Sequence, residues 1–259
     1  MAQKKKLTAT VFRQEQIAAG IYDMWIETDL AKDAKPGQFI SIYPKNQATL
    51  LPRPISICEV NEEKSALRIV YRVAGQGTRE FSNYHTGESI EILGTLGNGF
   101  PLEKADGKRV FLMGGGIGIP PMLQLSKELS ARGKAENISA ILGYRNELFL
   151  YEDFKAYADV YAATEDGSSG SKGTVMDAIR DNDLKGDIIF ACGPMPMLKG
   201  IAAICKEKGI YCEISLEERM ACGIGACLGC ACRTTRNDEE YFAHVCKDGP
   251  VFNAEEVIW

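Results

Sequence analysis

Short stretches in which apolar and polar residues alternate run through the first hundred residues. IYDMWIETD (21–29) is the clearest example, and GQFISIYP, PISICEV and ALRIVYRV have a similar character. Alternation with a period of two is typical of strands that bury one face. About six such strands in so short a stretch predict a small antiparallel β-barrel, with one short helix around 78–84. We expect this barrel domain to span residues 1–101.

A different rhythm begins after Pro101, where short apolar runs alternate with helical stretches. Four runs predict strands: RVFLMG, NISAILGYR, ADVYAAT and GDIIFACG. Helices are predicted at 120–132, 175–181 and 195–208, with a helical turn near 151–157 and a loop at 165–173. Strand–helix alternation indicates βαβ units and a parallel sheet, so we expect an α/β nucleotide-binding domain at 102–211. From Glu213 the alternation stops, and a third, Cys/Gly-rich domain is expected at 212–259.

The composition narrows the class of protein. Of the 259 residues, 45% are apolar and 25% are charged, which is ordinary for a globular protein. The longest apolar runs are far too short to cross a bilayer. The lysines of MAQKKKLTATVF are not followed by the apolar stretch of a secretory signal, so we expect a cytoplasmic protein. The net charge of −5 disfavours a nucleic acid partner, because phosphate binding needs a basic face.

Cysteines gather in RMACGIGACLGCAC. The chain has nine cysteines, and in a cytoplasmic protein such a cluster indicates metal or redox chemistry rather than disulfides. The spacing is Cys222-x4-Cys227-x2-Cys230, with Cys246 after fifteen further residues. This is the plant-type spacing of the ligands of a 2Fe-2S cluster. It selects Cys230 over Cys232, which we take as non-ligating.

Small residues between these cysteines suit the same chemistry. Gly223, Gly225 and Gly229 allow the backbone to bend tightly, and their N–H groups can point at the sulfur atoms. A zinc site made of four cysteines is the alternative. Zinc ribbons favour paired C-x2-C knuckles, and this sequence has one such knuckle.

Two glycine-rich turns follow predicted strands of the second domain. VFLMGGGIGIPPML contains Gly114, Gly115, Gly116 and Gly118, and ACGPMPML contains Cys192, Gly193, Pro194 and Met195. Backbone N–H groups at such a turn can bind a pyrophosphate, and ligands of parallel sheets bind at the carboxyl ends of strands. The two turns are therefore predicted to line one nucleotide crevice. The strict G-x-G-x-x-G fingerprint is absent, so a purely structural turn remains an alternative, as does a packing role for the cysteine.

Two segments of the barrel domain are candidates for binding phosphate. LPRPISI carries Arg53 and Ser56 on one extended segment, and an arginine can clamp a phosphate with two hydrogen bonds. IVYRVAGQGTREF ends a strand at Gly75 and Gly77 before a predicted helix at Thr78, where backbone N–H groups are free to bind an anion. The alternative for the arginine is an ordinary surface position.

Taken together, RPIS, YRVAGQGT, MGGGIGIPP, CGPMPML and the cysteine tail resemble the ferredoxin-NADP-reductase-like superfamily. More closely, they resemble the electron-transfer subunits of class 1B, NAD-linked dihydroorotate dehydrogenases of bacterial pyrimidine synthesis. The resemblance covers essentially the whole chain. It implies an FAD-binding barrel, an NAD-binding α/β domain and a small C-terminal 2Fe-2S domain, with FAD between the first two.

The resemblance also implies a set of contacts. The residues matched to FAD are Arg53, Pro54, Ile55, Ser56, Val70, Tyr71, Arg72, Gly77 and Thr78. Those matched to NAD are Gly114, Gly115, Gly116, Gly118, Cys192, Gly193, Pro194 and Met195. The implied cluster ligands are Cys222, Cys227, Cys230 and Cys246. Ile55 stands where the wider superfamily usually has an aromatic residue, although the dihydroorotate branch shares the aliphatic one.

By this resemblance the chain relays electrons between NAD and an FMN-containing catalytic subunit, in a heterotetramer of two relay and two catalytic subunits. We identify no base for dihydroorotate oxidation in the sequence, which agrees with a relay subunit. A relay subunit of a ferredoxin-linked NAD(P) transhydrogenase, a sulfide dehydrogenase or a hydrogenase complex is the first alternative. A non-catalytic, zinc-stabilised binding module is the second. Arg145 and Glu147 argue in opposite directions on NAD against NADP, and only the resemblance favours NAD.

Overall fold

The first domain is a closed barrel of six antiparallel strands, as the alternating pattern predicts. The computed structural model describes residues 4–259, so Met1–Gln3 of the lysine-bearing N-terminal segment lie outside the described residues. Around the barrel the order is β1 (Lys5–Ala18), β2 (Ile21–Glu27), β5 (Ala66–Arg72), β4 (Arg53–Val60), β3 (Phe39–Tyr43) and β6 (Ser89–Leu96). Its interior is filled by apolar side chains such as Val11, Met24, Ile40 and Leu67, whose burial drives closure.

Two short helices accompany the barrel: η1 (Asp29–Lys32) and α1 (Gln76–Phe81). The helix expected around 78–84 begins two residues earlier. Extended Gly75 precedes it, and the hydroxyl of Thr78 accepts hydrogen bonds from the backbone N–H groups of Ala74 (2.9 Å) and Gly75 (3.2 Å). These bonds satisfy N–H groups that a helix start leaves unpaired.

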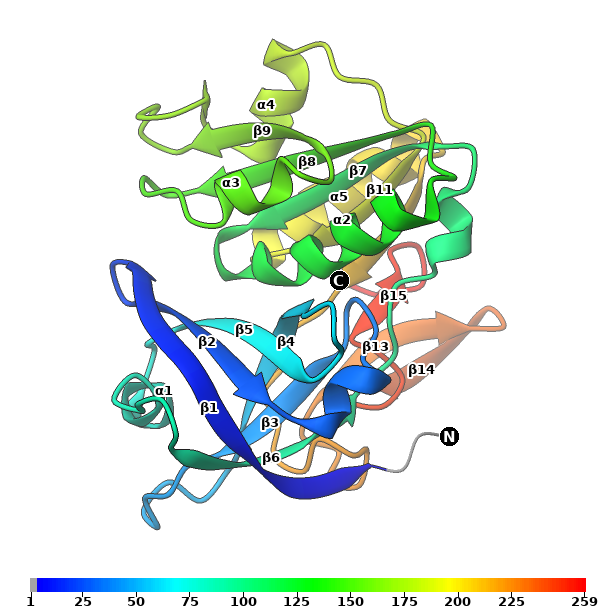
Figure 1. Ribbon diagram of the computed structural model, residues 1–259. Helices are drawn as coiled ribbons and strands as arrows, with labels where there is room; N and C mark the ends of the chain where they lie inside the picture. The colour runs from blue at the N-terminus through cyan, green and yellow to red at the C-terminus, as the bar shows by residue number, and fades with distance from the viewer. Residues whose placement is uncertain (1–3) are drawn as a thin grey trace.

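The second domain is a mainly parallel sheet covered by helices on both faces (Figure 1). Its order is β10 (Ser171–Lys172), β9 (Asp159–Thr164), β8 (Asn137–Tyr144), β7 (Arg109–Gly115), β11 (Ile188–Cys192), β12 (Tyr211–Ser215) and β15 (Val251–Asn253). The helical segments are η2 (Leu102–Ala105), η3 (Gly116–Gly118), α2 (Pro120–Arg132), α3 (Tyr151–Phe154), α4 (Val175–Asp181) and α5 (Met195–Lys208). Strand β10 lies within the stretch that we expected to be a loop.

Side chains at alternate positions of the strands pack into two separate hydrophobic cores, one on each face of the sheet. Val110 and Leu112 of β7 pack with α2 and α3, whereas Phe111 and Met113 pack with α4 and α5. This follows from the period of two, because successive side chains of a strand point to opposite faces. The expected βαβ architecture is therefore confirmed.

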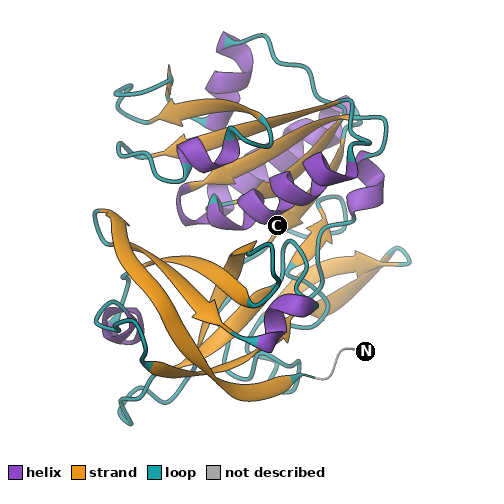
Figure 2. Ribbon diagram, viewed as in Figure 1, coloured by secondary structure: helices purple, strands orange, loops and turns teal. Residues whose placement is uncertain are grey.

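The C-terminal part contains strands that the sequence pattern did not predict. β13 (Ala231–Arg236) and β14 (Glu239–His244) form a hairpin, and β15 runs antiparallel to β12 at the edge of the nucleotide-binding sheet (Figure 2). Asn237 and Asp238 join the hairpin with positive φ values of 53° and 63°, as a two-residue turn requires.

Helix α2 packs against the barrel and joins the two larger domains. Ile119 and Met122 share a core with Cys58 and Val70 of the barrel. Beside this apolar contact, the Gln124 side chain accepts a 2.8 Å hydrogen bond from the backbone N–H of Val60. Within residues 4–259, every helix falls short of the length and apolarity needed to span a membrane.

Candidate functional site

The RPIS segment forms the start of β4 on the wall of the barrel. Arg53, Pro54, Ile55 and Ser56 are each only partly buried, whereas the strand continues into fully buried positions. The guanidinium of Arg53 donates a 2.6 Å hydrogen bond to the carbonyl of Leu51. This segment is thus an open strip on an otherwise packed strand, as a site for a flat cofactor would be.

The second matched segment meets the first at the start of α1. A Cβ on Gly77 would lie 2.8 Å from Nε of Arg53, so the bare glycine lets the arginine lie over the helix start. Tyr71 and Thr78, in contrast, turn away from this strip. The Tyr71 hydroxyl donates a 2.8 Å hydrogen bond to Gln14 inside the barrel, and the Thr78 hydroxyl closes the first turn of α1. Their contacts to a flavin would therefore come from the backbone.

The two glycine-rich turns lie side by side at the carboxyl ends of β7 and β11. The strands are parallel neighbours, with Cys192 opposite Gly114. A Cβ on Gly118 would overlap the carbonyl oxygen of Cys192, and a Cβ on Gly115 would overlap the sulfur of Met197. Glycine is therefore required at position 118 for the two turns to approach so closely.

Arg72, at the end of β5, lies close to the first glycine turn. A Cβ on Gly116, a residue with φ of 53°, would lie 3.7 Å from the Arg72 guanidinium. The carboxyl group of Glu217, an exposed residue, lies near enough to the same guanidinium for the positive charge of Arg72 to favour its ionised form. Burial raises the pKa of the Cys192 thiol to about 12, with a further contribution from Glu217. The thiol therefore stays protonated at neutral pH.

The sequence reasoning did not single out Glu217. A signal was available, because Glu217 follows β12 by two residues and so lies at the carboxyl edge of the sheet, where ligands of such sheets bind. We considered Arg145 and Glu147 for discrimination between NAD and NADP. The two side chains contact different parts of the molecule. The Glu147 carboxylate accepts a 3.0 Å hydrogen bond from Ala19 of the barrel, and Arg145 is 3.9 Å from Glu165 on the surface.

The four cysteines of the plant-type spacing converge in two pairs. The Cys222 and Cys227 thiols are neighbours, and so are those of Cys230 and Cys246, where the backbone N–H of Cys246 also donates to the Cys230 sulfur at 3.4 Å. Among residues 4–259, no group of three or more His, Cys, Asp or Glu surrounds a single metal position. Two thiolates for each of two metals is the arrangement that a 2Fe-2S cluster takes.

Backbone N–H groups point at these sulfur atoms. Gly225 donates to the Cys246 sulfur at 3.1 Å, and Ala226 donates to that of Cys222 at 3.3 Å. Burial alone would raise the pKa of Cys222, but N–H bonds from Ile224 and Ala226, together with the Cys227 thiol, lower it to about 6. A low pKa favours the thiolate that an iron ligand must be, so the residues present fit the cluster.

The loop of residues 222–230, which we call the cluster loop, packs against the barrel. A Cβ on Gly223 would lie 3.2 Å from the side chains of both Leu96 and Ser41, which belong to β6 and β3. Gly223 has φ of 68°, which favours glycine. Cys232 lies on β13 opposite Ala243, outside the two thiol pairs.

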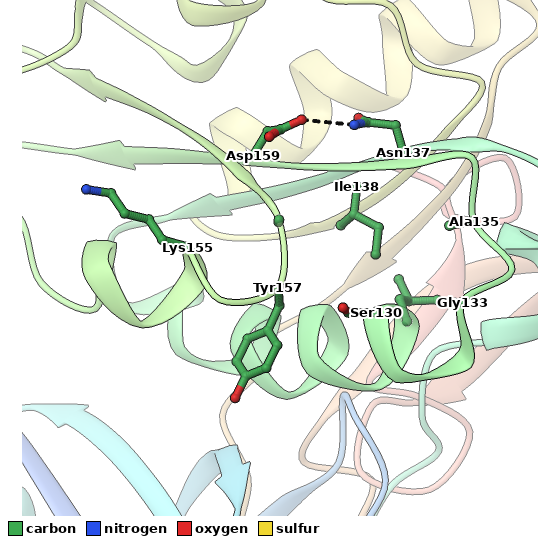
Figure 3. A pocket seen from close by; sticks show the side chains of 10 residues that line it. Ser130, Gly133, Ala135, Asn137, Ile138, Lys155, Tyr157 and Asp159 are labelled. Atoms are coloured by element: carbon green, nitrogen blue, oxygen red, sulfur yellow. Dashed lines mark hydrogen bonds between the residues drawn. The ribbon is translucent and has the colours of Figure 1, made fainter.

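Figure 3 shows a separate hollow at the other end of the parallel sheet. Asn137 and Asp159, which begin β8 and β9, are joined there by a 2.9 Å hydrogen bond. The glycine turns lie at the carboxyl ends of the strands. This hollow therefore lies at the opposite end of the sheet from the glycine turns.

A closed antiparallel barrel, a parallel sheet with two neighbouring glycine turns at the carboxyl ends of its strands and a plant-type cysteine loop together define an iron–sulfur reductase of the ferredoxin-NADP-reductase-like superfamily. Two family models agree with this class. The iron–sulfur cluster binding domain of dihydroorotate dehydrogenase B matches residues 217–258, and the oxidoreductase NAD-binding domain matches residues 112–203.

Relatives that match this chain over nearly its whole length establish its family. The dihydroorotate dehydrogenase B (NAD(+)), electron transfer subunit of Bacillus velezensis is 43% identical over 258 residues, covering 98% of this chain and 99% of its own length. The subunit of the same name from Geobacillus sp. is 42% identical over 259 residues, with the same shares covered. The chain belongs to the family of dihydroorotate dehydrogenase B electron transfer subunits.

Solved structures agree with the fold. A structure of an NADH-dependent reduced ferredoxin-NADP oxidoreductase, described in terms of flavin-based electron bifurcation, superposes with a TM-score of 0.85. It is 31% identical and covers 97% of this chain and 90% of that chain. A ferredoxin NADP+ reductase from Neisseria gonorrhoeae with bound FAD and NADP has a TM-score of 0.68 at 17% identity, covering 81% and 93% of the two chains, and shows the fold alone.

Proposed function

We propose that this chain relays electrons between NAD and a partner dihydroorotate dehydrogenase subunit, in the synthesis of pyrimidines in the cytoplasm. The observation that carries the proposal is the position of the barrel between the other two sites. Arg72 of the barrel approaches Gly116 of the nucleotide crevice, and Leu96 and Ser41 of the barrel meet Gly223 of the cluster loop. Family membership supports the same assignment.

When bound, the flavin would exchange a hydride with NAD and single electrons with the cluster, because a flavin can do both. The residues proposed to hold FAD are Arg53, Pro54, Ile55, Ser56, Val70, Tyr71, Arg72, Gly77 and Thr78. Those proposed for NAD are Gly114, Gly115, Gly116, Gly118, Cys192, Gly193, Pro194 and Met195. The proposed iron ligands are Cys222, Cys227, Cys230 and Cys246.

The side chains of the crevice have distinct proposed tasks. Arg53 holds a phosphate through its guanidinium, and Arg72 supplies positive charge where the flavin segment meets the nucleotide turns. The protonated Cys192 thiol adds no negative charge to the part of the crevice where the nucleotide would bind. The N–H groups of Gly225 and Ala226 stabilise thiolates.

Substrate oxidation is assigned to the partner subunit, which holds FMN, and the assembly is a heterotetramer of two relay and two catalytic subunits.

The test is reconstitution. The chain is co-expressed with a candidate dihydroorotate dehydrogenase subunit, and orotate formation is measured with NAD+ as the acceptor. We expect NAD+-linked orotate formation that neither subunit gives alone. Failure of the purified pair to reduce NAD+, although the chain contains iron, sulfide and flavin, would contradict the proposal.

A relay subunit of a ferredoxin–NAD(P) oxidoreductase complex is the second candidate. The 31% identity and TM-score of 0.85 to the reduced ferredoxin-NADP oxidoreductase favour it, whereas the identity to dihydroorotate dehydrogenase B subunits is 43%. The same preparation distinguishes the two, because the second candidate predicts nucleotide reduction with reduced ferredoxin and none with dihydroorotate.

A further inference from the structure

The β13–β14 hairpin has one face turned outward and one turned inward. The pairing sets Arg233 opposite Phe242 and Thr234 opposite Tyr241. Because side chains alternate between faces, Arg233 and Phe242 share the outer face. Thr234 and its neighbour Ala243 face inward and are buried, with exposed fractions of 4% and 2%.

Phe242 is 60% exposed on this outer face. Exposure of an aromatic ring does not by itself mark an interface, because Phe12 on β1 is 55% exposed as well, so the neighbours of Phe242 decide its role. The guanidinium of Arg233, directly across from it, donates two hydrogen bonds to Glu240, at 2.6 and 3.1 Å. A ring beside an ordered arginine is the composition that protein interfaces favour.

The hairpin is held firmly against the body of the molecule. The backbone N–H of Thr235 donates to the carbonyl of Glu256 at 2.7 Å, and that of Ile258 donates to the carbonyl of Arg233 at 3.0 Å. The C-terminal segment thus pairs with β13 and adds to what would otherwise be two isolated strands. The exposure of Phe242 is therefore a property of a fixed surface.

This outer face continues into the cluster loop. Ala231, at the start of β13, is exposed and donates a 3.2 Å hydrogen bond to the carbonyl of Leu228. Leu228 is 67% exposed and has φ of 61°, which is costly for a residue with a branched side chain. Cys227, the adjoining cluster ligand, is exposed as well. We call the set Leu228, Ala231, Arg233 and Phe242 the docking strip.

We propose that the docking strip binds the catalytic dehydrogenase subunit, with Phe242 as its main anchor. This rests on the proposed function, which requires electrons to cross between the cluster and that subunit. Electron transfer weakens steeply with distance, so the partner must lie close to an exposed part of the cluster loop, and the strip begins beside exposed Cys227. The loop alone is small beside the roughly 800 Å² per partner of a stable interface, and the hairpin extends it.

The experiment compares two aromatic residues of similar exposure. Phe242→Asp changes the strip, and Phe12→Asp changes strand β1 on the barrel, where Phe12 is 55% exposed. Figure 1 places β1 and the hairpin on different sides of the molecule. Each full-length variant is loaded with flavin and cluster, and its visible spectrum and NADH-driven dye reduction are measured. Its affinity for the purified dehydrogenase subunit is then measured by titration.

We expect Phe242→Asp to keep the spectrum and the dye reduction and to bind the dehydrogenase subunit at least tenfold more weakly. Phe12→Asp is expected to change the affinity less than twofold. Wild-type affinity in Phe242→Asp overturns the docking strip but leaves the proposed function standing. A change in self-association alone assigns the strip to a second copy of this chain and also overturns the proposal. Absence of binding by the wild type removes the proposed function itself.

Should Phe242→Asp lose its cofactors, Phe242→Ser is measured in its place, with Phe12→Ser as its control, and the same criteria apply.

Discussion

Arg68 on β5 donates a 2.6 Å hydrogen bond to Asp153 on α3, and this ion pair joins the barrel to the nucleotide-binding domain. The same guanidinium holds Asp23 at 2.8 Å and Glu59 at 3.1 Å. Lys127 on α2 reaches Glu59 at 3.0 Å. The largely buried Arg68 guanidinium therefore pairs with three carboxylates at the junction of the two domains.

Replacing Arg68 should destabilise the folded protein. The carboxylates of Asp23 and Glu59 would stay largely buried but would lose the positive charge that pairs with them. We expect Arg68→Met to lower the free energy of unfolding by about 3 kcal/mol and Asp153→Ala, whose side chain is more exposed, by about 1 kcal/mol. Urea unfolding provides the measurement. Glu152→Ala is the control on the same helix, because Glu152 forms its ion pair with exposed Lys155 of its own domain. Equal losses for Asp153→Ala and Glu152→Ala would contradict the assigned role.

Gly118→Ala should disturb nucleotide binding through its side chain alone. The added Cβ would overlap the carbonyl of Cys192 and push the two glycine turns apart. Overpacking of this kind costs about 1–3 kcal/mol, and we expect the KM for NADH to rise about tenfold or more in dye reduction. Gly200→Ala on α5 is the matched control, because its Cβ would meet open space. It should leave the KM unchanged and add roughly 0.5–1 kcal/mol of stability.

Cys222→Ser and Cys232→Ser should behave differently. Cys222 belongs to a thiol pair and its sulfur accepts two backbone hydrogen bonds, whereas Cys232 lies outside both pairs. We expect Cys222→Ser to lose the visible absorption of the cluster and the activity with the partner, yet to keep NADH-driven dye reduction. Cys232→Ser should retain all three. Loss of iron from Cys232→Ser alone would reverse the assignment of the ligands.

Glu213 should make stability fall as the pH rises. It is buried on β12, and burial raises its pKa above the ordinary value of 4.5, although a hydrogen bond with Tyr211 opposes the rise. The folded state then holds this proton more tightly than the unfolded chain does, so stability is lost as the pH rises from about 4.5 through the folded pKa. Glu213→Gln removes this loss. Denaturant unfolding of both proteins between pH 5 and 8 should show the variant gaining on the wild type with increasing pH, and parallel curves would refute the mechanism.

Several elements could be predicted from local sequence because their ends carry clear signals. Helix α2 begins at Pro120 and ends before Gly133, and α5 follows Pro194 and ends before Gly209. Proline suits a helix start and left-handed glycine suits a helix end, so both helices agree with the expected bounds. The cysteine spacing likewise indicated an iron–sulfur region at the C-terminal end, because that spacing belongs to one chemistry, and the family model of an iron–sulfur cluster binding domain matches residues 217–258.

Other features depend on contacts that no local pattern carries. Arg68 meets Asp153 across 85 residues of sequence, and Glu217 approaches Arg72 only once the domains have packed. Strand β15 has three residues, too few for periodicity to register. Such elements are fixed by tertiary packing, so the sequence reasoning missed them.

The return of β15 to the edge of the nucleotide-binding sheet bears on how such chains can be re-engineered. The 2Fe-2S region cannot simply be cut off after β12, because truncation there would remove the β15 partners of Ser215, Ile214 and Glu213 and leave β12 as an exposed edge strand that is prone to aggregation. A chimaera that swaps iron–sulfur regions between homologues must therefore transplant β12 and β15 as a unit.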